Sequence, residues 1–377
     1  MFRSTRDKAS DFERLATAPP YLRMASMHAT LFFAVWLGVL ALGQAETPAP
    51  LTVTPWDGDR DAAISLTFDD AMDTQLDNVA PILKKHGLHA TFFVSTGMKP
   101  WRARIRDWQR LAADGNEIGG HTVRHPCLLE RIEPHAQAYT PQMMEAEVRD
   151  SAQAILENIP SRRGLTFAYP CGNMSFGPPG DQARNEALYL RYVSEHFFAA
   201  RSYGWSGTVA RDELSILSVP DLGFSADRDF RGLLEMADPA LRNHRWGVLT
   251  FHGVGGEWLS VSSQALDELA AYLAHHAEIW TATFGDVVRY IQESKALAIR
   301  LVHSSGERVQ FELNWPLNSE IYDVPLTLKW QLPAGWKSAQ ANADRAPAAT
   351  RRAKSASPDT VVLEVTAGTG SVSFDRK

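Results

Sequence analysis

The sequence of 377 residues predicts a β/α barrel followed by a small antiparallel β-sandwich. Between residues 61 and 294, short β-forming runs alternate with amphipathic helical runs, which is typical of βα units around a parallel sheet. About seven or eight such units indicate a barrel rather than an open, doubly wound sheet. After residue 296 the helical period ends, and β-forming runs are separated by Pro and Gly turns.

The barrel elements follow from local residue preferences. Thr74 is expected to cap a first helix that ends at Gly87, because Thr favours helix starts and Gly favours helix ends. A second helix is expected over residues 101–113, and Pro141 opens a third that runs to residue 158. The expected barrel strands are residues 63–68, 90–95, 117–120, 165–169, 197–202, 215–219, 246–251 and 280–283.

The C-terminal region, residues 296–377, is expected to form the small β domain. Residues 340–358 are rich in Ala, Arg and Ser and are expected to form a mobile loop within it. The other strands of this domain are expected at residues 298–303, 308–313, 326–332 and 361–365.

The first 45 residues are interpreted as a signal peptide. Basic residues precede an apolar run over residues 29–43, and small residues follow at positions 43 and 45, where a signal peptidase would read them. That run is shorter than the ~20 residues that a membrane-spanning helix needs. An uncleaved anchor, or a true start at Met24 or Met27, remains an alternative. Residues 46–60 are then a linker, and the mature protein is expected to be periplasmic or secreted, without a stable membrane span.

The charge balance argues against a nucleic-acid partner. The net charge is −6 and the isoelectric point is near 6.1, whereas nucleic-acid binders are basic. No G-x-G-x-x-G or G-x-x-x-x-G-K-[ST] motif that would cradle a phosphate is present in the sequence.

Reactive side chains follow four of the expected strands. Each group alone has a common structural explanation, but the carboxyl ends of barrel strands meet at one face, where active sites form. Two imidazoles and one carboxylate would complete a three-ligand site for zinc or a similar ion. A second carboxylate would remain to take a proton from water. The four groups are Thr67-Phe68-Asp69-Asp70, His121-Thr122-Val123-Arg124-His125, Tyr169-Pro170-Cys171-Gly172 and Thr250-Phe251-His252-Gly253.

The order and spacing of these motifs over residues 62–294 resemble the polysaccharide deacetylase family, carbohydrate esterase family 4. The resemblance implies a distorted (β/α)7 barrel, a carbohydrate substrate and a divalent metal; we expect Zn²⁺, with Co²⁺ or another divalent ion as the alternative. The roles that it implies are a general base at Asp69, metal ligands at Asp70, His121 and His125, a general acid at His252, and an oxyanion-binding N–H at Cys171, with Tyr169 and Pro170 beside the substrate.

Three positions depart from the family pattern. Ala168 stands where the family has an Arg that holds the base, Cys171 stands where it has an aromatic residue, and Thr250 stands where it has a hydrophobic residue. Arg201, at the end of another strand, is the nearest candidate to replace the missing Arg. Trp258, in a glycine-flanked loop after the last motif, is a candidate for stacking on a sugar ring.

Cys127 and Cys171 are the two cysteines of the chain, and we predict that they form a disulfide. In an exported protein this pairing leaves no odd thiol, and both residues belong to loops at the expected active face. The alternatives are that Cys127 is a fourth metal ligand or that both thiols are free.

The sequence thus predicts a metal-dependent hydrolase that removes N- or O-linked acetyl groups from a polysaccharide or oligosaccharide, carried by residues 61–295. One alternative is a catalytically impaired protein of the same fold that binds carbohydrate or assists export. The other is an amidase that acts on a small molecule. The C-terminal domain is expected to contact a glycan or a protein partner.

Overall fold

The computed structural model describes residues 48–161, 163–204, 207–344, 350–352 and 359–377. The expected signal peptide lies outside the described residues. Within the described ranges, no helix has both the length and the apolar character that crossing a membrane requires.

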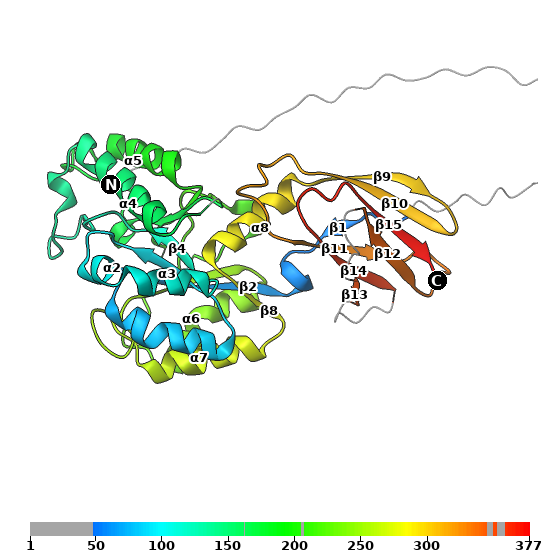
Figure 1. Cartoon of the computed structure of the whole chain (residues 1–377), viewed down its shortest axis with the longest axis horizontal. Coiled ribbons are helices and arrows are strands. Elements are labelled where there is room, and N and C mark those ends of the chain that lie inside the picture. Colours follow the sequence, from blue (N-terminus) through cyan, green and yellow to red (C-terminus); the bar gives the residue numbers. More distant parts are fainter. Residues whose placement is uncertain (1–47, 162, 205–206, 345–349, 353–358) are drawn as a thin grey trace, which may run out of the picture. The chain divides into compact units, whose positions relative to one another are not determined.

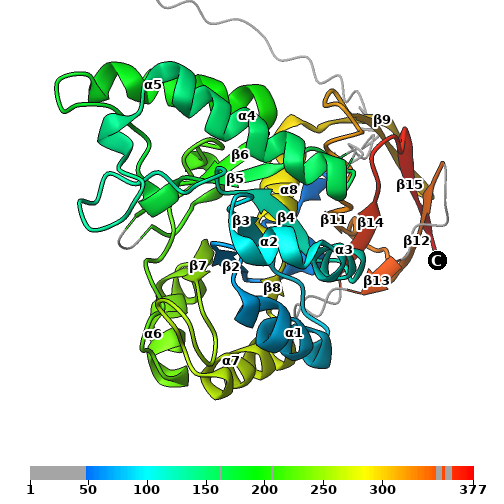
Figure 2. The same cartoon turned by 60° about the vertical axis from the view of Figure 1, so that its left-hand side comes forward.

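Seven parallel strands form the curled sheet of a distorted (β/α)7 barrel, as the sequence predicts (Figure 2). The sheet order is β6-β5-β4-β3-β2-β7, and β8 pairs with the first half of β2. The strands are β2 Ala62–Asp69, β3 Thr91–Val94, β4 Glu117–Gly120, β5 Thr166–Ala168, β6 Ala199–Arg201, β7 Trp246–Phe251 and β8 Ile279–Thr281.

The expected strand at residues 215–219 is wrong. This segment makes an isolated bridge between Val219 and Arg201, and Phe224 makes another with Thr250. The connection between β6 and β7 therefore pairs with each of these strands at a single residue. Irregular backbone, and not a full strand, fills this side of the barrel. Val219 is nevertheless buried in the barrel core.

The middle of the sheet is covered on both faces, and its composition reflects this. All eight residues of β2 are buried, as expected for a central parallel strand, whose two faces both pack against other elements. Phe68 lies between Phe92 and Phe251, with ring centroids 5.0 and 5.1 Å away. These contacts fix the register of β2 against β3 and β7, and the carboxyl ends of β2 and β7 carry Asp69, Asp70 and His252.

Helices surround the sheet (Figure 1). The first helical segment starts as a π-helix and ends at Gly87, whose φ of 65° suits glycine. Thr74 does not cap it, because its hydroxyl accepts a hydrogen bond from Val254 N instead. The expected helix at 101–113 is divided at Arg104. The helices are η2 Gln75–Val79, α1 Ala80–His86, α2 Lys99–Ala103, α3 Ile105–Ala113, α4 Pro141–Asn158, α5 Gln182–His196, α6 Phe230–Arg242, α7 Ser263–His275 and α8 Phe284–Ala296.

The C-terminal domain contains two four-stranded antiparallel sheets, ordered β1-β11-β14-β13 and β12-β15-β10-β9. Their inner faces share a core in which the Trp330 and Phe374 rings stack at 4.2 Å. The strands are β1 Thr52–Val53, β9 Ala298–Ser304, β10 Arg308–Asn314, β11 Leu326–Gln331, β12 Ala339–Ala343, β13 Thr350–Arg352, β14 Thr360–Val365 and β15 Ser371–Arg376.

Two expectations about this domain are corrected. Residues 46–60 are not simply a linker, because β1 pairs with β11 and the Trp330 indole donates to Ala49 O at 2.9 Å. The expected loop at 340–358 begins with β12, which pairs with β15. In both cases the pairing partner is distant in the sequence, so local composition did not reveal the strand.

Candidate functional site

The residues that follow the barrel strands line one cavity of about 620 Å³. It is open to solvent, and both polar and apolar side chains form its wall. The residues that line it are Asp69, Asp70, His121, His125, Leu129, Arg131, Ile132, Cys171, Gly172, Asn173, Arg201, Ser202, Tyr203, Asp221, Phe224, His252, Trp258 and Leu259.

Asp70, His121 and His125 form a cluster with the composition of a metal site. Their ligand atoms all lie within 4.8 Å of one another. Oδ1 of Asp70 is 3.6 Å from Nε2 of His121 and 3.5 Å from Nε2 of His125. That oxygen is buried and has no hydrogen-bond partner among the described residues. An orphaned carboxylate oxygen between two imidazoles fits a divalent cation.

The protonation states of the cluster also fit a cation. Burial lowers the pKa of His121 to about 3 and lowers that of His125, so both imidazoles are neutral. His121 directs Nδ1 to the carbonyl oxygen of Ala168 at 2.7 Å, which leaves Nε2 facing Asp70. Burial, together with the charge of Asp69, raises the pKa of Asp70 to about 6 against the favourable charges of His252 and Arg201. A bound cation would favour the ionised carboxylate.

The loops that carry these residues have unusual backbone conformations. Asp70, His125 and Cys171 have φ values of 79°, 61° and 52°, in the left-handed region that non-glycine residues seldom occupy. Such residues cluster at functional sites. Cys127 and Cys171 are joined by a disulfide with a Cα separation of 5.9 Å, which links the loop after His125 to the loop after β5.

Asp69 contacts Arg201. Nη2 of Arg201 donates to Oδ2 of Asp69 at 2.5 Å, and both side chains are buried. Burial alone would raise the pKa of Asp69, but the charge and the hydrogen bond of Arg201 hold it below its usual value. The other carboxylate oxygen, Oδ1, has no hydrogen-bond partner among the described residues. Asp69 is therefore an ionised carboxylate with one oxygen held and the other available.

His252 directly follows β7 and lines the same cavity. Its ring centroid is 5.4 Å from that of Phe224, and its backbone carbonyl accepts from the Gln75 amide at 3.2 Å. The same amide donates to Asp69 O, so Gln75 links the ends of β2 and β7. Among the described residues, no carboxylate is hydrogen-bonded to the His252 ring.

The third motif is divided between the cavity and the core. Cys171 lines the cavity, but Tyr169 and Pro170 do not. The Tyr169 ring is fully buried and packs against Tyr189 at 5.0 Å. The expectation that Tyr169 and Pro170 lie beside the substrate is therefore not matched by their side-chain positions.

Other cavity residues were less visible in the sequence. Trp258 lines the cavity as predicted, with 53% of its surface exposed. Asp221, Tyr203 and Phe224 were missed, and the Tyr203 and Phe224 rings pack against each other at 5.2 Å. Asp221 comes two residues after the buried Val219, so the same strand-end pattern could have suggested it.

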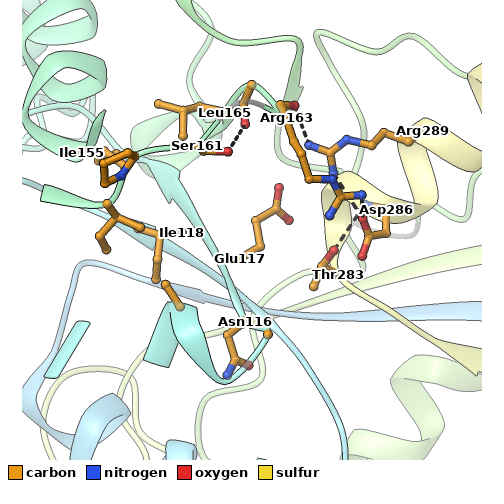
Figure 3. A pocket seen from close by; sticks show the side chains of 15 residues that line it. Asn116, Glu117, Ile118, Ile155, Ser161, Arg163, Leu165, Thr283, Asp286 and Arg289 are labelled. Atoms are coloured by element: carbon orange, nitrogen blue, oxygen red, sulfur yellow. Dashed lines mark hydrogen bonds and ion pairs between the residues drawn. The ribbon is translucent and has the colours of Figure 1, made fainter. Parts of the chain in front are cut away.

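A second cavity, of about 270 Å³, lies near Glu117, the first residue of β4 (Figure 3). Its charged groups pair with one another. Arg289 donates to Asp286 and to the carbonyl of Arg163, and the guanidinium of Arg163 also contacts Asp286. Glu117 accepts from Thr91 and Thr166. This arrangement indicates a structural role, in contrast to the orphaned groups of the first cavity.

Parts of the chain are similar to known proteins. Residues 57–187 match the family model of polysaccharide deacetylase. The chain is 26% identical over 326 residues to a gellan lyase from a Bacillus species, covering 75% of this chain and 12% of that protein. It is 31% identical over 116 residues to a chitooligosaccharide deacetylase from Rhizobium leguminosarum bv. trifolii, covering 30% of this chain and 49% of that protein.

The chain therefore spans less than half the length of these curated relatives. Among solved structures, a family 4 acetyl xylan esterase from Clostridium thermocellum, in complex with a cobalt ion, aligns with a TM-score of 0.39 and 17% identity. That alignment covers 60% of this chain and 91% of the esterase. The similarity to the polysaccharide deacetylase family thus covers residues 57–187 of this chain.

Proposed function

We propose that this protein is an exported, divalent-metal-dependent hydrolase that removes N- or O-linked acetyl groups from a polysaccharide or oligosaccharide. The observation that carries the proposal is the Asp70, His121 and His125 cluster beside a separate carboxylate, Asp69, in one cavity. The match of residues 57–187 to the family model of polysaccharide deacetylase supports the same reaction class. The catalytic region is proposed as residues 61–295, with residues 296–377 as the small β domain.

Asp70, His121 and His125 would hold the ion, with Zn²⁺ expected and Co²⁺ as an alternative. When bound, a divalent ion lowers the pKa of water and polarises a carbonyl group. The chain contributes the orientation of the ligands: His121 is fixed by Ala168 O. The left-handed backbone of Asp70 and His125 sets the directions of the other two ligands.

Asp69 acts as the general base. Its free oxygen takes a proton from the attacking water as the new bond forms between the water oxygen and the acetyl carbon. Arg201 keeps the carboxylate ionised and holds its second oxygen. Arg201 thus supplies the guanidinium that is missing at Ala168, which supports an active enzyme over a catalytically impaired one.

The remaining steps use Cys171 and His252, which line the same cavity. The backbone N–H of Cys171 donates to the developing oxyanion. His252 gives a proton to the departing sugar nitrogen or oxygen as the bond to the acetyl carbon breaks, and acetate is the second product. Trp258 offers an exposed aromatic face for a sugar ring.

Export and the partner of the β domain are part of the same proposal. The Cys127–Cys171 disulfide supports an oxidising compartment, where such bonds persist. We propose that the β domain contacts a glycan or a protein, and similarity to a gellan lyase supports a glycan.

Acetate release tests the proposal directly. The purified chain is assayed with N-acetylated chitooligosaccharides and O-acetylated xylo-oligosaccharides, before and after EDTA treatment and after Zn²⁺ is restored. We expect acetate release that EDTA abolishes and Zn²⁺ restores. Release that resists the chelator would contradict metal dependence, and zinc-loaded protein that releases no acetate from either panel would contradict the deacetylase assignment.

A further inference from the structure

Thr250 lies between two buried charged groups of the cavity. Its hydroxyl accepts a hydrogen bond from Nη1 of Arg201 at 2.7 Å and donates one to Oδ2 of Asp221 at 2.7 Å. Thr250 is fully buried, and Arg201 and Asp221 are 3% and 1% exposed. The hydroxyl therefore links a guanidinium to a carboxylate away from solvent.

The direction of this link is fixed by the chemistry of the hydroxyl. A threonine hydroxyl has one proton to donate and lone pairs that accept. Arg201 only donates and an ionised Asp221 only accepts, so the Thr250 proton points to Asp221 and a lone pair faces Arg201. Both bonds involve a charged partner, and such bonds are the stronger ones.

Asp221 is itself anchored by the backbone. Its Oδ1 accepts from the N–H groups of Gly204 at 3.2 Å and Gly223 at 3.1 Å. The carboxylate is thus fixed to the connection between β6 and β7. Through Thr250, this fixed point reaches the guanidinium that contacts Asp69.

Arg201 depends on few other contacts. Nη1 also donates to the Thr67 hydroxyl at 2.9 Å, and Nη2 donates to Asp69. Its buried Nε has no hydrogen-bond partner among the described residues. Without the Thr250 hydroxyl, Nη1 of Arg201 would keep one hydrogen bond, to the Thr67 hydroxyl.

We propose that Thr250 and Asp221 are positioning residues, which form a relay that holds Arg201 against Asp69. The relay explains why a polar residue stands at position 250, because a hydrophobic residue there would leave Arg201 and Asp221 unlinked. The proposal rests on the proposed function in taking Asp69 as the general base. It assigns Asp221 to Arg201, through the Thr250 hydroxyl.

Substitution of the linking hydroxyl tests the relay. Thr250→Val keeps the side-chain shape and removes the hydroxyl, and Thr250→Ser restores the hydroxyl in a smaller residue. We expect Thr250→Val to lower kcat by roughly 10- to 100-fold, as for other residues that orient an active-site group. KM and metal content should stay unchanged, and Thr250→Ser should recover most of the loss.

Asp221→Asn provides a second, independent variant. It should lower kcat similarly. The double variant Asp221→Asn with Thr250→Val should have a kcat only slightly below that of the more impaired single variant, because both substitutions act through the contact between Arg201 and Asp69. Thr166→Val is the matched control: it removes another buried strand hydroxyl, which contacts Glu117 at 2.9 Å outside the cavity. It should leave kcat unchanged.

Crystal structures of the Thr250→Val and Thr250→Ser variants give a readout that does not depend on activity. We expect Nη2 of Arg201 to move beyond about 3.5 Å from Asp69 in the Val variant, outside hydrogen-bond range, and to stay in contact in the Ser variant. An unchanged contact in the Val variant, or a full kcat in that variant, would overturn the relay. If the wild type releases no acetate, the proposed function fails, while the crystal structures still decide the relay.

Discussion

Arg201 and Asp69 form a buried ion pair across the interior of the curled sheet. The two residues are 132 positions apart in the chain, on β6 and β2, and β5, β4 and β3 lie between those strands in the sheet. Their side chains are each 4% exposed. A guanidinium from one wall of the barrel thus holds a carboxylate on the other.

Replacement of Arg201 by Ala should lower kcat and move the acidic limb of the pH–kcat profile to higher pH. Arg201 holds the pKa of Asp69 down, while burial raises it. Without Arg201 the base stays protonated to a higher pH, and activity is lost earlier on acidification. Arg191→Ala, at a surface Arg of α5 that pairs with Glu195, is the control. An unchanged kcat and acidic limb in Arg201→Ala would contradict the pairing.

Metal content should distinguish the proposed metal ligands from Asp69, the proposed general base. His121→Ala should lose the bound metal, because it removes one of three ligands, and Asp69→Asn should keep the metal and lose turnover. Elemental analysis and acetate release measure both effects. His275→Ala, at an exposed His in the last turn of α7, should change neither. Loss of metal in Asp69→Asn would mean that the roles of Asp69 and Asp70 are reversed.

The disulfide should be present in the purified exported protein. Thiol titration of denatured, unreduced protein should find no reactive thiol, since Cys127 and Cys171 are paired. The double Cys→Ser variant should be less stable to urea by about 4 kcal/mol in the chain-entropy model, because the bond closes a loop of 44 residues. Two reactive thiols per chain would exclude the bridge.

Glu293 should make stability fall as pH rises. Burial raises the pKa of this α8 carboxyl from 4.5 to about 7. Between these values the unfolded chain loses its proton while the folded chain keeps it, so the free energy of unfolding decreases. After discounting for solvent screening, we expect the free energy of unfolding to decrease by roughly 1–2 kcal/mol between pH 5 and pH 8.

Urea denaturation at both pH values measures this effect. Glu293→Gln should remove that part of the pH dependence, whereas Glu320→Gln, at an exposed loop residue, should keep it. Parallel pH curves for wild type and Glu293→Gln would show that Glu293 does not titrate between pH 5 and pH 8 in the folded protein.

The strand-end motifs were predictable because they are local. Each places reactive side chains directly after a β-forming run, and parallel strands bring such ends to one face. Asp70, His121 and His125 do meet within 4.8 Å. The strand ends also suggested Arg201 as a partner for Asp69, because strand-end residues share that face even when their strands are not neighbours.

Other features could not be read from local pattern. Strand β1 has two residues and is defined only by its pairing with β11, about 275 positions later in the chain. The burial of Tyr169 depends on Tyr189, on α5, so its motif position alone suggested a site residue. Asp221 follows a segment that makes an isolated bridge and no strand, which hid its place beside Thr250.

The sequence by itself determined the alternation of strands and helices, the face at which the motifs gather, and the residue types that the proposed metal-assisted hydrolysis uses. Periodicity and short motifs encode these features, because each depends on neighbours within a few residues. The tertiary structure alone decided which polar groups pair: Arg201 with Thr250, Thr250 with Asp221, and β1 with the C-terminal sheet. These pairings depend on the curl of the sheet and on the path of the loops, which bring together residues that no short stretch of sequence relates.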